Sequence, residues 1–279
     1  MEEQLHFLNG SFVPEEKLVV SVRDLGFMRG YAVFDFLRTY NRRPFQLHRN
    51  IDRLFNSAHA IGLHIPWSKE EITKWVLETL DKNKSDTREK TIKITVSGGI
   101  SPHMLPTVDP TIVIITDPRI PYPQDYYDTG VAAISVKFTR YVPEAKTNNY
   151  IEGVKQAQIA DKQGAIEPVY YDEVQVFEGS NSSIFAVIDN KLLTTKSQIL
   201  GGVTRQVLLE ILKLDIPVEV SDFTIEQLLA AKEAFFTSSS RGITSIVRID
   251  DKIIGDGRVG PVAKEVMRQF AEYTSSDTW

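Results

Sequence analysis

Lys146 lies in a short polar segment, residues 143–150 (PEAKTNNY), between a β-rich run and a helix-like run. A lysine amine attacks a carbonyl carbon only when it is neutral, and desolvation or a neighbouring cation lowers a lysine pKa from about 10.4 by several units. Taken alone, Lys146 is most simply a solvated lysine, because charged side chains are mostly exposed. A nucleophilic role therefore requires other functional groups, and further segments of the chain supply candidates.

Groups that bind an anion occur in three places. Residues 201–204 (GGVT) form a glycine turn that opens a predicted helix, and a helix N-terminus offers unpaired N–H groups and partial positive charge. Residues 238–240 (SSS) follow a predicted strand and offer hydroxyl and N–H donors. Arg53 lies beside the apolar stripe of another predicted helix and could supply a bidentate cation. Each also has a simpler interpretation. Residues 201–204 would be a plain turn, residues 238–240 a polar turn, and Arg53 a solvated surface arginine.

Glu178 precedes a turn of small residues and could hold a proton on a ring nitrogen, although a solvated loop glutamate is the simpler interpretation. The five histidines are scattered, and only His59 and His64 are loosely spaced for a metal, so we expect no metal site. No phosphate-binding loop of the P-loop or dinucleotide kind occurs in the sequence.

Composition restricts the possible partners. The 279 residues are 42% hydrophobic and 25% charged, which is typical of a globular protein. A net charge of −5 argues against nucleic acid or an anionic membrane surface as the main partner. The chain has no cysteine, which excludes disulfides and thiolate catalysis. It shows no signal peptide and no apolar run near the ~18 residues of a membrane helix, so we expect a cytoplasmic protein.

Hydrophobic periodicity predicts the elements that must position these groups. Strands are expected at residues 5–13 (a hairpin turning at Asn9-Gly10), 18–22, 31–38, 91–96, 111–116, 131–138, 168–171, 173–177, 184–188, 191–193 and 234–237. Helices are expected at residues 47–62, 68–80, 150–163, 201–212 and 261–273, with another capped by Thr224 and Gln227. A proline-containing stretch predicts an N-terminal domain 1–117, a linker 118–130 and a C-terminal domain 131–279.

The order of the candidate segments resembles that of the class IV aminotransferases. These are pyridoxal-phosphate enzymes of fold type IV and include D-amino-acid transaminases, branched-chain aminotransferases and aminodeoxychorismate lyases. The resemblance covers nearly the whole chain and rests on residues 50–54 (NIDRL), 146–150 (KTNNY), 178–180 (EGS), 202–205 (GVTR) and 237–240 (TSSS). It implies a two-domain fold that combines α+β and α/β features, with a small N-terminal α/β domain and a larger C-terminal mixed-sheet or pseudo-barrel domain. It also implies pyridoxal 5′-phosphate as cofactor and a homodimer.

The resemblance assigns roles by position. Lys146 would hold the cofactor through a Schiff base and move a proton during catalysis, Glu178 would pair with the ring nitrogen, and Tyr150 would hydrogen-bond the phenolic oxygen. The remaining assignments are phosphate binding by Arg53, Val203, Thr204 and Ser239, a place near the substrate carboxylate for Ser240, and a place in the pocket wall for Phe34.

The substrate is less defined, because two specificity patterns of the family are broken. The S-P-R-x-H loop of typical D-amino-acid transaminases reads SPHML at residues 101–105, and Lys93 stands where branched-chain members often have an arginine. Arg29, in residues 29–31 (RGY), is similar to an arginine that binds the α-carboxylate in an atypical subgroup of D-amino-acid transaminases. We therefore favour transfer between a D-amino acid, such as D-alanine or D-glutamate, and a 2-oxo acid. Branched-chain L-amino-acid transamination, aminodeoxychorismate lyase activity and a non-enzymatic binding module are the alternatives.

Overall fold

The computed structural model describes residues 4–106, 108–276 and 279, and the chain forms two compact units. One unit contains residues 1–120 together with residues 144–149, and the other contains residues 121–143 and 150–279. The Lys146 segment therefore belongs to the N-terminal unit. The domain boundaries at residues 117 and 131 stay a prediction.

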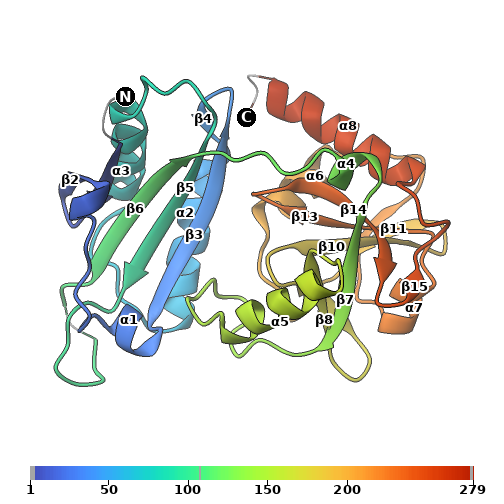
Figure 1. Ribbon diagram of the computed structural model, residues 1–279, viewed down its shortest axis with the longest axis horizontal. Coiled ribbons are helices and arrows are strands. Elements are labelled where there is room, and N and C mark those ends of the chain that lie inside the picture. Colours follow the sequence, from blue (N-terminus) through green and yellow to red (C-terminus); the bar gives the residue numbers. More distant parts are fainter. Residues whose placement is uncertain (1–3, 107, 277–278) are drawn as a thin grey trace. The chain divides into compact units, whose positions relative to one another are not determined.

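The N-terminal unit is built on an antiparallel sheet with the strand order β2-β1-β6-β5-β3-β4 (Figure 1). Its strands are β1 (Leu5–Leu8), β2 (Ser11–Pro14), β3 (Ala32–Tyr40), β4 (Arg43–Pro44), β5 (Lys90–Ser97) and β6 (Thr111–Pro118). Its helices are η1 (Glu15–Lys17), α1 (Leu25–Arg29), α2 (Leu47–Ala60) and α3 (Lys69–Lys82). Buried residues of β3, β5 and β6 form one core with the apolar faces of α2 and α3.

Local sequence explains the main elements of this unit. The hairpin turns at Asn9-Gly10, both of which have positive φ, as a two-residue turn requires. Helix α3 begins with the predicted capping box, in which Ser68 and Glu71 each bind the other's backbone N–H. The periodicity of β5 places alternate residues, among them Ile92 and Ile94, in the core.

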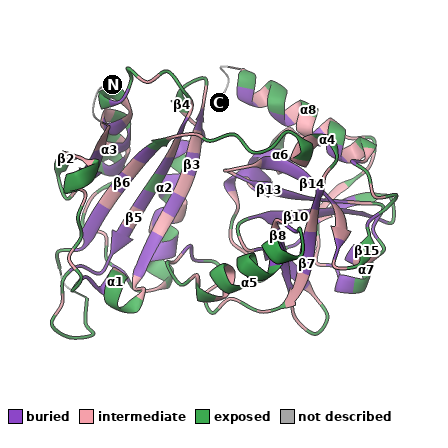
Figure 2. Cartoon of the chain, viewed as in Figure 1, coloured by how far each residue is buried: buried purple, intermediate pink, exposed green. Residues whose placement is uncertain are grey.

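The C-terminal unit contains a mixed nine-stranded sheet with the order β12-β11-β10-β13-β14-β7-β8-β9, and β15 also pairs with β14. Its strands are β7 (Val131–Lys137), β8 (Glu167–Tyr171), β9 (Val176–Gly179), β10 (Ser183–Ile188), β11 (Lys191–Thr194), β12 (Val218–Val220), β13 (Glu233–Ser238), β14 (Gly242–Ile249) and β15 (Lys252–Ile253). Its helices are α4 (Asp125–Asp128), α5 (Ile151–Lys162), α6 (Val203–Ile211), α7 (Ile225–Leu229) and α8 (Pro261–Ser275). Figure 2 shows the central strands buried and α5 largely exposed.

The strand expected at residues 18–22 is absent, the one expected at residues 173–177 begins only at Val176, and one long strand of the structure was not expected. Residues 18–22 form no strand, because Val19, Val20 and Val22 are exposed, and a β-prone composition alone does not pair. The unexpected strand, β14, joins β13 to β7 near the centre of the larger sheet. Strand β14 was not predicted because it follows directly on the polar residues 238–240 and because Arg248 interrupts its apolar pattern.

Candidate active site

The Lys146 segment pairs with β3 through a single antiparallel bridge between Thr147 and Val33. The Phe34 N–H donates to the Lys146 carbonyl at 2.9 Å, and the Asn148 N–H donates to the Ala32 carbonyl at 2.9 Å. On α2, the Ser57 Oγ accepts a hydrogen bond from the Lys146 N–H at 3.0 Å. The main chain of the lysine is therefore fixed by both β3 and α2.

The Lys146 side chain is directed at an aromatic ring. Its Nζ lies 4.7 Å from the centre of the Phe34 ring, and the Nζ of Lys93 lies 5.0 Å from the same centre. Lys146 is 9% exposed, whereas Lys93 is exposed to solvent. The fold thus brings together three residues that the sequence proposed for the site, with two amines on one ring.

Arg53 projects from α2 and is held by a buried acid. Its Nε donates to Asp35 Oδ2 at 2.9 Å and its Nη2 donates to Asp35 Oδ1 at 2.9 Å, while Asn50 Oδ1 accepts from Nη2 at 3.2 Å. Asp35 is fully buried on β3. A bidentate pair of this kind fixes the plane of the guanidinium. Sequence reasoning missed Asp35, although it is the one acid in the otherwise apolar first half of that strand.

Glu178 lies on β9 and is 6% exposed. Its Oε1 lies 2.8 Å from the Nη2 of Arg140, and its Oε2 accepts from the Leu200 N–H at 3.0 Å. Both contacts orient the carboxylate. Leu200 directly precedes the glycine turn, so the same contact ties Glu178 to the start of α6. Arg140 is a second residue that sequence reasoning missed.

The N-terminus of α6 is suited to an anion. Its N-cap, Gly202, makes no side-chain capping bond, and a Cβ at this position would collide with the Ser183 Oγ. Ser183 on β10 stands opposite Thr237 on β13, which puts both hydroxyls on one face of the sheet beside the helix end. The Thr237 Oγ1 is buried and has no hydrogen-bond partner among the residues that the structure describes. A buried hydroxyl of this kind is costly unless a ligand or water binds it, so these residues fit a phosphate group.

Ser239 and Ser240 form the turn between β13 and β14. Both are half-buried, and the Ser240 Oγ lies 3.3 Å from the Ser238 Oγ. Val203 and Thr204, the first two residues of α6, are buried. The C-terminal unit therefore holds four of the residues proposed for the phosphate and the substrate carboxylate, and Arg53 belongs to the N-terminal unit.

Arg205 and Tyr170, two further residues of the C-terminal unit, have shifted pKa values. Burial lowers the pKa of Arg205, whose Nε donates to the Thr194 Oγ1, although the charge of Glu178 opposes this shift. The pKa of Tyr170 is raised by burial and then by Glu152, Glu167 and Tyr150. Tyr150 thus shares the surroundings of Tyr170, at the N-cap of α5.

Arg29 ends α1 with an exposed guanidinium, whose Nη1 donates to the Met28 carbonyl at 2.9 Å. The described residues contain no group of three or more histidine, aspartate or glutamate side chains that could hold a metal ion. Within the same part of the chain, no helix is long and apolar enough to cross a membrane.

Comparison with known proteins identifies the family. The model of amino-transferase class IV matches residues 32–249, so the chain belongs to the class IV aminotransferases. The chain is 31% identical over 276 residues to a D-alanine aminotransferase of Staphylococcus aureus, covering 97% of this chain and 98% of that protein. It is also 31% identical over 273 residues to a D-alanine aminotransferase of Listeria monocytogenes, covering 95% of this chain and 94% of that protein. The branched-chain amino acid aminotransferase of Thermoproteus uzoniensis superposes with a TM-score of 0.88 at 28% identity, covering 99% of this chain and 96% of that chain.

These comparisons confirm the expected family, the two-part mixed α and β fold of type IV, and the aminotransferase class of the enzyme. They also confirm pyridoxal 5′-phosphate as the cofactor of the family, since similar solved structures contain pyridoxamine 5′-phosphate or a phosphopyridoxyl derivative. The roles assigned to individual residues stay predictions.

Proposed function

We propose that this chain is a transaminase that moves an amino group between a D-amino acid, such as D-alanine or D-glutamate, and a 2-oxo acid. The observation that carries this proposal is the similarity to D-alanine aminotransferases along almost the full length of both chains. Branched-chain L-amino acids are the second candidate substrates, supported by the TM-score of 0.88 to a branched-chain enzyme.

In this proposal pyridoxal 5′-phosphate, when bound, supplies an electron sink for the carbanion formed at the substrate Cα. Lys146 would hold this cofactor, and its Nζ, when not bonded to the cofactor, would move a proton at the substrate Cα. The contacts of the Lys146 main chain with β3 and α2 support this role, because they fix the backbone from which the amine projects. Phe34 packs beside the amine, and Lys146 is 9% exposed.

Glu178 would pair with the ring nitrogen, because Arg140 and the Leu200 N–H orient its carboxylate. Tyr150 donates to the phenolic oxygen. The phosphate is bound by Arg53, by the backbone N–H groups of Val203 and Thr204, and by Ser239. We add the hydroxyls of Ser183 and Thr237 to this set, since Ser183 lies against Gly202 at the start of α6 and Thr237 is paired opposite Ser183.

The substrate carboxylate is bound by Arg29 and Ser240 in this proposal, with Lys93 as a further cation beside Phe34. Arg29 has the charge for this role and an exposed guanidinium. Arg29 and Ser240 determine the substrate specificity in this proposal. They are needed because histidine replaces the arginine that typical D-amino-acid transaminases carry in the 101–105 loop.

The enzyme is a homodimer in this proposal. Two neighbouring segments of the N-terminal unit, which pair at Asp24 and Ile100, expose a set of large apolar side chains. These are Val19, Val20, Val22, Phe27, Met28, Ile100, Met104, Leu105 and Val108. Exposed apolar patches of this kind mark protein interaction sites. Light scattering coupled to gel filtration tests the homodimer, and a monomeric mass would contradict it.

Because a chain without cysteine needs no oxidising compartment, we place the enzyme in the cytoplasm.

A half-reaction panel tests the substrate class. Single D- and L-amino acids are added to the purified holoenzyme, and the loss of the near-visible cofactor absorbance is followed. We expect D-alanine or D-glutamate to bleach the cofactor and Lys146→Ala to lack this absorbance. Bleaching by L-leucine without bleaching by D-alanine would overturn the D-amino-acid assignment, and release of pyruvate from aminodeoxychorismate without an amino acceptor would indicate a lyase.

A further inference from the structure

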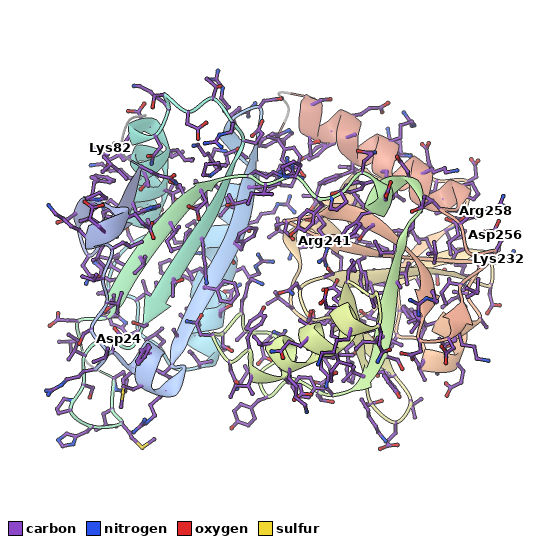
Figure 3. All side chains as sticks on the ribbon, viewed as in Figure 1. Asp24, Lys82, Lys232, Arg241, Asp256 and Arg258 are labelled. Atoms are coloured by element: carbon purple, nitrogen blue, oxygen red, sulfur yellow. The ribbon has the colours of Figure 1, made fainter. Side chains whose placement is uncertain are left out.

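Arg241 directly follows the Ser239-Ser240 turn and forms a buried ion pair with Glu167 of β8 (Figure 3 labels Arg241). Its Nη2 lies 2.6 Å from the Glu167 Oε1 and donates to the Ser182 Oγ at 2.9 Å. The two side chains are only 9% and 2% exposed. Neither residue belongs to the set assigned to the cofactor or the substrate.

The second oxygen of Glu167 holds the turn that follows Glu178. The Glu167 Oε2 accepts from the Ser180 Oγ at 3.2 Å and from the Asn181 N–H at 3.1 Å. The Gly179 N–H closes this turn on the Ser182 carbonyl at 2.7 Å. A Cβ at Gly179 would lie only 3.0 Å from the Glu167 Oε1, so the turn is seated closely on the carboxylate. The turn after the expected ring-binding acid is therefore fixed by the ion pair.

The backbone of Arg241 is fixed as well. Its N–H donates to the Ser238 Oγ at 3.2 Å, and its carbonyl accepts from the Tyr127 hydroxyl at 3.0 Å. The Ser238 Oγ in turn lies 3.3 Å from the Ser240 Oγ. The serine turn consequently cannot shift without moving Arg241.

The ion pair maintains the charge of Arg241. Burial alone would lower the pKa of Arg241, but the neighbouring Glu167 carboxylate outweighs burial and the pKa of Arg241 is raised. A buried ion pair is often no more stabilising than well-packed apolar residues of similar volume. Stability therefore gives little reason for this pair, whereas its place between two turns of the site gives a specific one.

We propose that Arg241 and Glu167 are positioning residues that lock the Ser239-Ser240 turn to the Glu178–Ser182 turn, so that the phosphate-binding and ring-binding groups are held in one fixed geometry. This inference rests on the proposed function, because that function makes these turns the cofactor site. It adds a residue pair that touches neither the cofactor nor the substrate and acts through the two turns.

The test measures how much the phosphate group contributes to binding. Apoprotein is titrated with pyridoxal 5′-phosphate and with pyridoxal, which lacks the phosphate, and the ratio of the two dissociation constants is compared among variants. Arg241→Met removes the cation, and Glu167→Gln removes the charge while keeping the volume. Arg248→Met is the matched control, because Arg248 is an arginine of the adjoining strand β14 that donates to the Asp250 and Gln163 carbonyls. Melting temperatures of all apoproteins are recorded in parallel.

We expect Arg241→Met and Glu167→Gln to lower the phosphate preference about tenfold or more, since each displaces charge-assisted hydrogen bonds. Arg241→Lys should recover part of the preference, and Arg248→Met should keep all of it. If Arg241→Met does not fold, Glu167→Gln and Arg241→Lys decide the question. A wild-type preference in Glu167→Gln and Arg241→Lys, whatever their melting temperatures, would overturn the positioning role alone. Failure of the wild-type protein to bind pyridoxal 5′-phosphate on Lys146 would instead overturn the proposed function and this inference with it.

Discussion

Gly202→Ala is the most direct test of the phosphate site. The added Cβ would collide with the Ser183 Oγ but would lie 3.7 Å from the Ser183 Cβ, which is an ordinary contact. Since φ at Gly202 is −62°, alanine adopts this backbone without strain. The substitution therefore acts by forcing the Ser183 hydroxyl to rotate away from the N-terminus of α6.

The magnitude follows from the hydrogen bond that is lost. A hydrogen bond to a charged group contributes about 1.5–3 kcal/mol, so losing the Ser183 hydroxyl should weaken binding of pyridoxal 5′-phosphate about 10- to 100-fold. Because Gly202→Ala and Ser183→Ala remove the same contact, their effects should not add in the double variant. Absorbance titration of the apoprotein measures each affinity.

Gly201→Ala is the matched control. A Cβ there would meet only the Gln206 Nε2 at 3.3 Å, and this flexible amide can move aside. We expect an affinity within about twofold of wild type, because no fixed group is displaced. Fully additive losses in Gly202→Ala and Ser183→Ala, or a Ser183→Ala protein that binds as tightly as wild type, would refute the reasoning.

Two further predictions concern stability. Arg140→Met leaves the Glu178 carboxylate buried without its cation and should lower the free energy of unfolding by about 3–5 kcal/mol in urea titrations. Lys191→Met, which breaks the exposed ion pair with Glu219, is the control and should lower it by at most about 1 kcal/mol. Equal losses in the two variants would contradict this prediction. Burial alone would raise the pKa of Asp222, but hydrogen bonds from the Lys196 N–H and from Ser197 outweigh it and lower that pKa. Because the folded-state value lies below the unfolded value of about 3.9, the stabilisation by Asp222 is present above that pH and is lost as the pH falls through the folded value. The difference in unfolding free energy between wild type and Asp222→Asn should therefore be largest near pH 7 and should disappear at acid pH. A difference that does not change with pH would contradict the lowered pKa of Asp222.

Local sequence was sufficient for features set within a few residues. The Asn9-Gly10 hairpin, the capping boxes of α3 and α7, and the glycine turn that opens α6 each depend on neighbouring residues and were predicted correctly. The placement of Lys146 between β7 and α5 follows from the same periodicity. The family resemblance also came from the order of short motifs, and the comparisons confirm it.

Tertiary structure alone decided which distant groups meet. Asp35 reaches Arg53 because β3 packs under α2, and Thr237 faces Ser183 because β13 pairs with β10 in one particular register. Glu167 and Arg241 are 74 residues apart, and no local pattern marks either as the partner of the other. The sequence alone determined the types of chemical group in this protein and their order, because local periodicity and motif spacing are properties of neighbouring residues. Strand register and helix packing bring remote side chains into contact, so the contacts that orient those groups were fixed only in the folded chain.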